Sequence, residues 1–154
     1  MELKDKDALL KYLKSQNLMS LATCGPDMWI STVYYVVDEK FNLYFISEAT
    51  ANHCQAFKKN VEVSCAIADS RQPVTAKKIG VQIRGKASQV NSLQKMKWML
   101  AMWNKVNPGF EAIINLKNIQ KRVIKSKVYK IQPQAIKFFN EELYGEEGFL
   151  MFKF

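Results

Sequence analysis

The sequence lacks the features that usually mark membrane, exported and metal-binding proteins. No apolar run reaches the about 20 residues that span a bilayer, and the N-terminal "MELKDKDALLKYLKSQN" alternates charges with leucines. The three cysteines, Cys24, Cys54 and Cys65, match neither a disulfide framework nor a zinc motif. We therefore expect a cytoplasmic protein with reduced thiols, no membrane segment and no metal site.

The motifs of common catalytic sites are also missing. The sequence contains no P-loop, GxGxxG, HExxH, CxxC or GxSxG pattern. His53 is the only histidine, so a Ser–His–Asp or Cys–His–Asn triad would have to use it. A barrel with so few candidate acids and bases is typical of proteins that leave the chemistry to a cofactor.

What the sequence does contain is the balance of a folded domain. The chain has 154 residues, of which 48% are hydrophobic and 24% charged, so we expect one globular domain over residues 1–154. The formal net charge is +9 and comes mainly from scattered lysines. Two interpretations of this charge stay open: a solvated surface, or attraction for a polyanion such as a phosphorylated cofactor or nucleic acid.

Hydrophobic periodicity predicts a mainly β fold with several helices. Alternation in "VEVSCAIA" and "IGVQIRGKASQV" indicates strands with one buried face, and Gly85 inside the second predicts a bend. Helix 91–106 is apolar on two sides, which is typical of a helix between two partners or in an oligomer interface. The expected helices are 5–16, 50–59, 91–106 and 107–119, and the expected strands are 18–24, 29–38, 43–47, 61–68, 79–90, 122–133 and 135–139. This order predicts an antiparallel barrel with helices packed outside it.

The segment "SEATAN", residues 47–52, joins a strand to a helix. Ser47, Thr50 and Asn52 can each accept a hydrogen bond from a free N–H group of the helix, so simple capping explains them. The same residue types at a helix N-terminus also suit a phosphate. The residues alone leave both interpretations open.

Residues 21–90 resemble the FMN-binding split-barrel family related to pyridoxamine 5'-phosphate oxidase. Three segments carry the resemblance: "LATCGPDMWISTVYYVVDEKFNLYFISEATANHCQAF", "NVEVSCAI" and "VQIRGKASQV". The tail "VYKIQPQAIKFF" also resembles the end of that family. The resemblance implies a six-stranded antiparallel split β-barrel with flanking helices, which forms a homodimer with two FMN sites at the interface.

The resemblance also implies roles for individual residues. One strand follows the flavin, the joint meets the phosphate, and the strand "KKIGVQIRG" contributes from across the interface. The implied cofactor-binding residues are Ser31, Thr32, Val33, Ile46, Ser47, Thr50, Asn52, His53, Lys78 and Gln82.

One departure from the family pattern leaves the cofactor open. Many FMN-binding members carry Arg or Lys at the positions of Ala51 and Asn52. Lys58, Lys59, Lys77 and Lys78 are candidate replacements, and the deazaflavin F420 or no cofactor are the alternatives to FMN. The expected function is a flavoprotein, as an oxidoreductase acting on an unidentified small molecule. The competing functions are a cofactor-free structural or regulatory dimer and, ranked last, a nucleic-acid-binding barrel that would stack bases on its aromatic residues.

Overall fold

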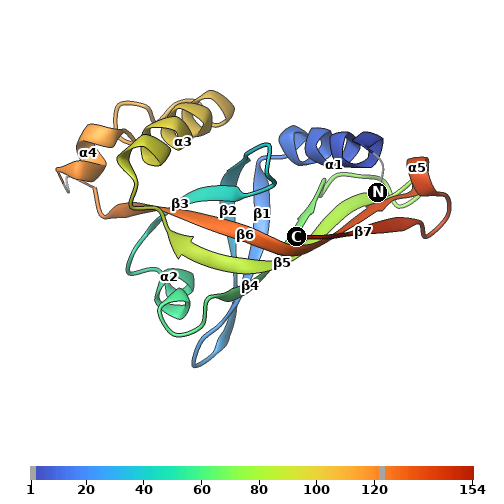
Figure 1. Cartoon of the computed structure of the whole chain (residues 1–154), viewed down its shortest axis with the longest axis horizontal. Helices are drawn as coiled ribbons and strands as arrows, with labels where there is room; N and C mark the ends of the chain where they lie inside the picture. Colours follow the sequence, from blue (N-terminus) through green and yellow to red (C-terminus); the bar gives the residue numbers. More distant parts are fainter. Residues whose placement is uncertain (1–2, 122–123) are drawn as a thin grey trace.

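A computed structural model describes residues 3–121 and 124–154 as five helices and seven strands (Figure 1). The helices are α1 (Leu3–Ser15), α2 (Asn52–Phe57), α3 (Leu93–Val106), α4 (Leu116–Gln120) and α5 (Glu141–Tyr144). The strands are β1 (Leu18–Cys24), β2 (Met28–Val37), β3 (Leu43–Glu48), β4 (Glu62–Ala68), β5 (Ile79–Gln89), β6 (Ser126–Asn140) and β7 (Phe149–Lys153).

Six of the strands close into an antiparallel barrel. The strand order is β3-β2-β1-β4-β5-β6-β7, and an added pairing between β3 and β6 closes the ring. Two strands pair with the same edge of β6. Its first part pairs with β3 (Leu43↔Ile131), and its second part pairs with β7 (Ala135↔Lys153). The predicted mainly β barrel with flanking helices is therefore confirmed, and β7 is an addition to it.

Alternating side chains fill the interior of the barrel. In β5, Val81, Ile83 and Ala87 are buried, and the side chains of Gln82, Arg84 and Lys86 point outward. The predicted bend is also present: the register of β5 against β6 shifts between Arg84 and Gly85. A Cβ atom on Gly85 would lie 2.5 Å from the carbonyl oxygen of Gln132, so only glycine allows the two strands this approach.

Helix α3 covers the outer side of β2 and β3 with one of its faces. Met99 and Leu100 are buried there against Val36 and Tyr44, with α4 beside them. Trp98, on the other apolar side of α3, keeps 41% of its surface exposed. The prediction that α3 packs against two partners is confirmed within the chain, since it contacts β2 and α4, and a place in an oligomer interface stays a prediction.

The C-terminal third of the chain differs most from expectation. The predicted helix over 107–119 is wrong, because Asn107 ends α3 and Asn115 caps the short α4. The two predicted strands 122–133 and 135–139 form the single strand β6, and residues 122–123 lie outside the described residues. Helix α5 and strand β7 were not predicted.

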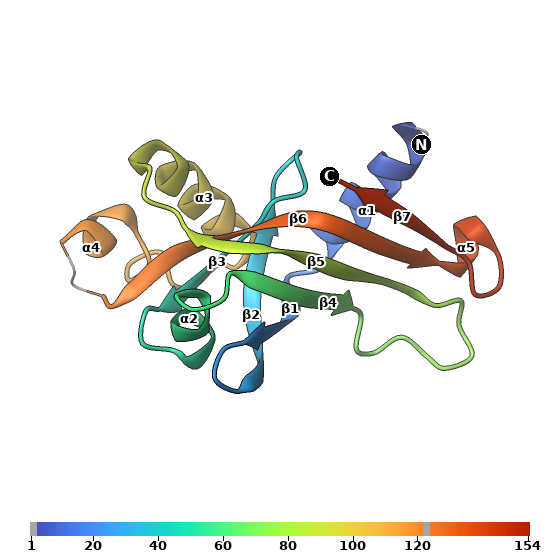
Figure 2. The same cartoon turned by 60° about the horizontal axis from the view of Figure 1, so that its bottom comes forward.

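Two views agree on how the helices are placed around the barrel (Figures 1 and 2). Helices α3 and α4 lie at one end of the sheet, α1, α5 and the N-terminus lie toward the other, and the C-terminus lies nearer the middle. Helix α2 packs against β1 and β2. None of the helices in the described residues has the length and apolar character of a membrane span.

Candidate functional site

The joint between β3 and α2 is not held together by side-chain capping. Helix α2 begins after Ala51, whose side chain cannot accept a bond, and no side-chain hydrogen bond caps the helix in this described part of the chain. Ser47 instead pairs with His53, at 2.8 Å between Oγ and Nε2. Thr50 and Asn52 are exposed. The capping interpretation is therefore wrong, and two polar side chains of the joint are available to a ligand.

His53 is packed into aromatic surroundings behind the joint. Its ring lies 6.1 Å from that of Phe45 and 6.0 Å from that of Phe57, between ring centroids. Burial lowers the pKa of this imidazole below its ordinary value, so His53 is neutral at pH 7. A neutral imidazole in contact with Ser47 fixes the orientation of that hydroxyl group.

Cys54, the thiol next to the joint, is buried as well. Its pKa is raised, chiefly by burial, although Tyr129 and Ser47 lie close to it. Because the thiolate is the reactive form, this environment disfavours a redox thiol at the joint.

The edge of β2 that faces β3 is open over most of its length. On its other edge β2 pairs with β1 from Met28 to Tyr34, whereas its pairing with β3 covers only Tyr35 to Val37. Within the described chain no strand therefore lies beside residues 28–34 on this edge. Backbone N–H and C=O groups along such an edge need partners from outside the sheet. This opening is the split of the barrel, and it includes the predicted Ser31, Thr32 and Val33.

A pocket of about 480 Å³ separates the β1–β2 hairpin from α2, and we call it the hairpin pocket. Two lysines, one carboxylate (Asp27) and two amides contribute to its lining. Thr23 lies at its wall, only 4% exposed, and its hydroxyl has no hydrogen-bond partner among the described residues. Asn52, Lys58 and Lys59 of α2 and the turn after it line the side opposite Thr23. The pocket thus places two of the four candidate replacement lysines around Asn52.

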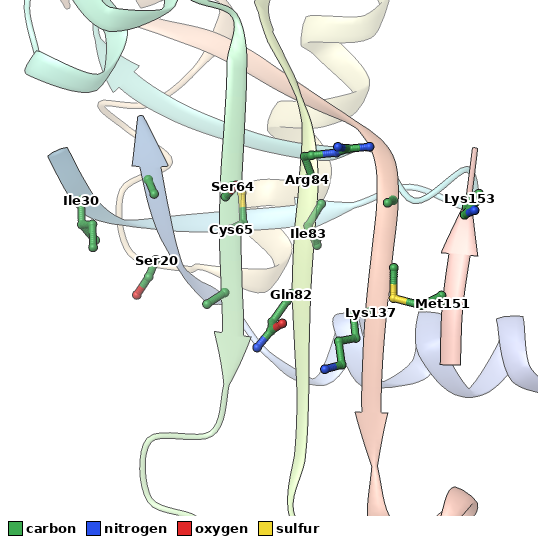
Figure 3. Close-up of a pocket in the computed structure, with 13 residues that line it drawn as sticks. Ser20, Ile30, Ser64, Cys65, Gln82, Ile83, Arg84, Lys137, Met151 and Lys153 are labelled. Atoms are coloured by element: carbon green, nitrogen blue, oxygen red, sulfur yellow. The ribbon is translucent and has the colours of Figure 1, made fainter. Parts of the chain in front are cut away.

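The outer face of β1, β4, β5, β6 and β7 carries a second, broader groove of about 690 Å³ (Figure 3). We call this surface the uncovered face, because helices α3 and α4 lie over the other part of the barrel. Strand pairing arranges its side chains in two rows. One row runs Thr32, Ser20, Ala66, Gln82, Lys137 and Met151, and the other runs Ile30, Ala22, Ser64, Arg84, Ala135 and Lys153.

The small residues of these rows line the middle of the groove, and cations lie toward one side. Gln82 and Lys137 are paired on neighbouring strands and lie side by side in Figure 3. The structure also brings Thr32 and Gln82, two of the predicted site residues, into one row.

Other predicted residues are placed differently. The side chains of Ser31 and Val33 point to the inner side, opposite Leu21 and Met19, and their backbone groups pair with β1, so Thr32 is the one of the three whose backbone N–H and C=O face the split. Ile46 packs under α3 and α4.

Lys78 lies far from the joint within the chain. Its backbone pairs with Glu141 beside the start of β5, whereas the joint lies near the opposite end of that strand. A contribution from Lys78 to the site therefore requires a second copy of the chain.

Sequence reasoning missed the cations of the uncovered face. Arg84 alternates with Gln82 and was accessible from the period of β5. The position of Lys137 could not be predicted, because residues 135–139 were treated as a separate segment whose register was unknown.

Comparison with known proteins identifies the family. The model of the pyridoxamine 5'-phosphate oxidase family matches residues 5–140. The chain belongs to this family. Among curated relatives, a UPF0306 protein of Yersinia enterocolitica is 32% identical over 88 residues, which are 56% of this chain and 59% of that protein. The match thus spans about three fifths of the relative.

Solved structures of low sequence identity share the fold of this family member. A protein of Clostridium acetobutylicum, related to general stress protein 26 of B. subtilis and of the pyridoxinephosphate oxidase family, superposes with a TM-score of 0.65 at 10% identity, covering 99% of this chain and 96% of that one. A heme binding protein from Mycobacterium smegmatis gives a TM-score of 0.71 at 17% identity, covering 94% and 56%. At these identities the likeness establishes the fold alone.

Proposed function

We propose that this chain is a flavoprotein that binds FMN in the split of the barrel, with the phosphate toward the joint. The observation that carries the proposal is the open edge of β2 lying beside a joint at which the side chains of Thr50 and Asn52 are exposed and do not cap the helix. Family membership supports the same assignment.

The residues present fit such a cofactor. The pyrimidine part of a flavin carries carbonyl oxygens and ring nitrogens, which match the backbone groups that alternate along the open edge of β2, at Ile30, Thr32 and Tyr34. The phosphate needs donors and positive charge, and these are available from Thr50, Asn52 and the two lysines of the hairpin pocket. The unpartnered hydroxyl of Thr23 is a further donor at the wall of that pocket.

The proposed site includes a second copy of the chain. The groove of the uncovered face is lined by small residues such as Ser20, Ala22 and Ala66, a composition that lets two sheets pack closely. Packing there would bring Gln82 of one copy toward the flavin of the other. We therefore include a homodimer, with the cofactor at its interface, in the proposal.

FMN supplies hydride or electron transfer when it is bound, and the protein positions it. The backbone of β2 orients the ring, the lysines hold the phosphate, and His53 holds the hydroxyl of Ser47 in place. Because the cofactor supplies the chemistry and the protein positions it, an oxidoreductase of this kind needs no catalytic triad.

The competing functions find less support. Heme is a candidate because a structural neighbour is a heme binding protein. The only histidine of this chain, however, is 8% exposed and bonded to Ser47, so it is poorly placed as an axial ligand. Of the four aromatics that would stack bases, Tyr34 alone is half-exposed, and the burial of Tyr35, Tyr44 and Phe45 opposes stacking on them.

The test compares FMN with riboflavin, which lacks the phosphate, on the protein and on two variants. We expect FMN to bind at least about tenfold more tightly than riboflavin, as for one charge-assisted contact. Asn52→Asp adds a negative charge beside the phosphate and should remove this preference, whereas Asn91→Asp, before α3, should keep it. Equal affinity for both flavins, or an unchanged preference in Asn52→Asp, would overturn the assignment. Hemin and F420 titrated in parallel identify a different cofactor if FMN does not bind.

A further inference from the structure

A third cavity lies where α3 ends against β2, and we call it the aromatic pocket. Its volume is about 440 Å³, within the about 300–1,000 Å³ of ordinary small-molecule sites. Aromatic and aliphatic side chains make most of the lining, and no charged residue contributes to it. The residues that carry the argument are Asn17, Tyr34, Trp103, Asn107, Phe110 and Ile114.

The walls come from three separate segments of the chain. Tyr34 and Phe110 present half-exposed rings, while Trp103 is buried at the base, only 6% exposed. Half-exposed rings that line a concavity are apolar surface not used by the protein's own core. A flat apolar ligand would remove this surface from water.

The polar groups of the aromatic pocket are neutral. Asn17 donates a side-chain hydrogen bond to Asn107 across 3.4 Å, and this amide pair joins the start of β1 to the end of α3. The indole N–H of Trp103 is buried and has no hydrogen-bond partner among the described residues. Neutral donors without a nearby cation favour a ligand with a hydroxyl or carbonyl group over an anion.

The aromatic pocket also adjoins the proposed flavin site. Tyr34 follows Thr32 on the same face of β2, about 7 Å along the strand. A ligand against Tyr34 would therefore lie next to a ring held along residues 31–33.

We infer that the aromatic pocket binds a neutral, flat aromatic molecule that carries a hydrogen-bonding oxygen, and that it is the substrate pocket of the flavin site. The second part rests on the proposed function, and the binding itself does not. The inference excludes phosphorylated substrates, because nothing in the lining neutralises a phosphate.

The test uses 2-naphthol and 2-naphthalenesulfonate, which share a ring system and differ in charge. Equilibrium dialysis measures both probes on the full chain, with and without FMN. Nonspecific attraction to a chain of net charge +9 would favour the sulfonate. We expect the opposite order, with 2-naphthol bound at least about tenfold more tightly.

A pair of variants in one turn locates the site. Phe110→Ser removes a lining ring and should weaken the binding of 2-naphthol by about tenfold. Ile113 is exposed in the same turn and is not part of the lining, so Ile113→Ser should leave the affinity unchanged. Tighter binding of the sulfonate, or equal effects of the two variants, would overturn the inference. Binding of 2-naphthol without FMN uptake would keep the binding pocket and contradict the flavin proposal, together with the substrate role that rests on it.

Discussion

At the scale of single residues, His53 connects stability to pH. It is the only histidine, and burial holds its pKa below the ordinary value of 6.5. As pH falls, His53 is therefore protonated in the unfolded chain before it is protonated in the folded chain. The free energy of unfolding therefore decreases as pH falls through the ordinary histidine range. Most carboxylates titrate at lower pH, so between about pH 7 and 5.5 the pH dependence of stability comes mainly from His53.

The prediction is a free energy of unfolding that declines with decreasing pH over this interval. Urea titrations of the natural chain and of His53→Asn measure it. The variant should be less stable at pH 7.5 yet show a flatter pH dependence. Equal slopes for the two proteins would show that His53 does not titrate in the way its burial requires.

Lys58 and Lys59 are the residues that we expect to replace the missing basic positions at Ala51 and Asn52. Changing both to alanine should weaken the binding of FMN by about tenfold, because charge-assisted contacts to the phosphate are lost. The salt dependence of FMN binding should also decrease. Riboflavin binding should not change. The matched control is Lys95→Ala with Lys97→Ala, two exposed lysines of α3, which removes equal charge outside the hairpin pocket. Equal losses in both double variants would mean that only net charge matters.

At the scale of elements, Gly85 shows how one residue shapes a strand. Alanine there would place Cβ against the backbone of Gln132, which cannot move without disturbing β6. We expect Gly85→Ala to lower the free energy of unfolding by about 1–3 kcal/mol. Gly80→Ala, in the same strand, meets its nearest atoms at 3.5 and 3.6 Å and should change stability by less than about 1 kcal/mol. Similar losses for both variants, measured by urea unfolding, would contradict the close approach.

The strands were the most predictable elements because burial leaves a period of two in the sequence. Cys65 and Ile83 were assigned to the inner face from this alternation and are buried there. Residues 107–119 failed for a local reason: "NP" resembles the start of a helix, whereas Asn107 here ends α3. β7 is held by pairing with β6, and such a distant contact leaves no local signal.

The candidate site was less predictable than the fold. The order of residues placed Thr50 and Asn52 at the joint, but only tertiary structure shows that neither caps the helix. The hairpin pocket is formed by segments about 30 residues apart, so the role of Lys58 could not be read from spacing.

At the scale of the whole molecule, the proposal requires self-association through the uncovered face. Ala66 lies in the middle of its rows and is exposed in the single chain, so a glutamate there should not disturb folding. In a packed interface it would bury an unpaired charge, and we expect Ala66→Glu to be monomeric. Ser70→Glu, in the loop before β5, should remain dimeric in sedimentation experiments. A dimer that persists in Ala66→Glu would place the interface elsewhere.

The central claim is that the split of this barrel holds FMN, and an equilibrium titration of the purified chain tests it most directly. Flavin fluorescence and the visible absorption spectrum are followed as FMN is added. We predict saturable quenching at micromolar FMN, with one cofactor per chain. A colourless protein that leaves FMN fluorescence unchanged at concentrations well above this range would contradict the account.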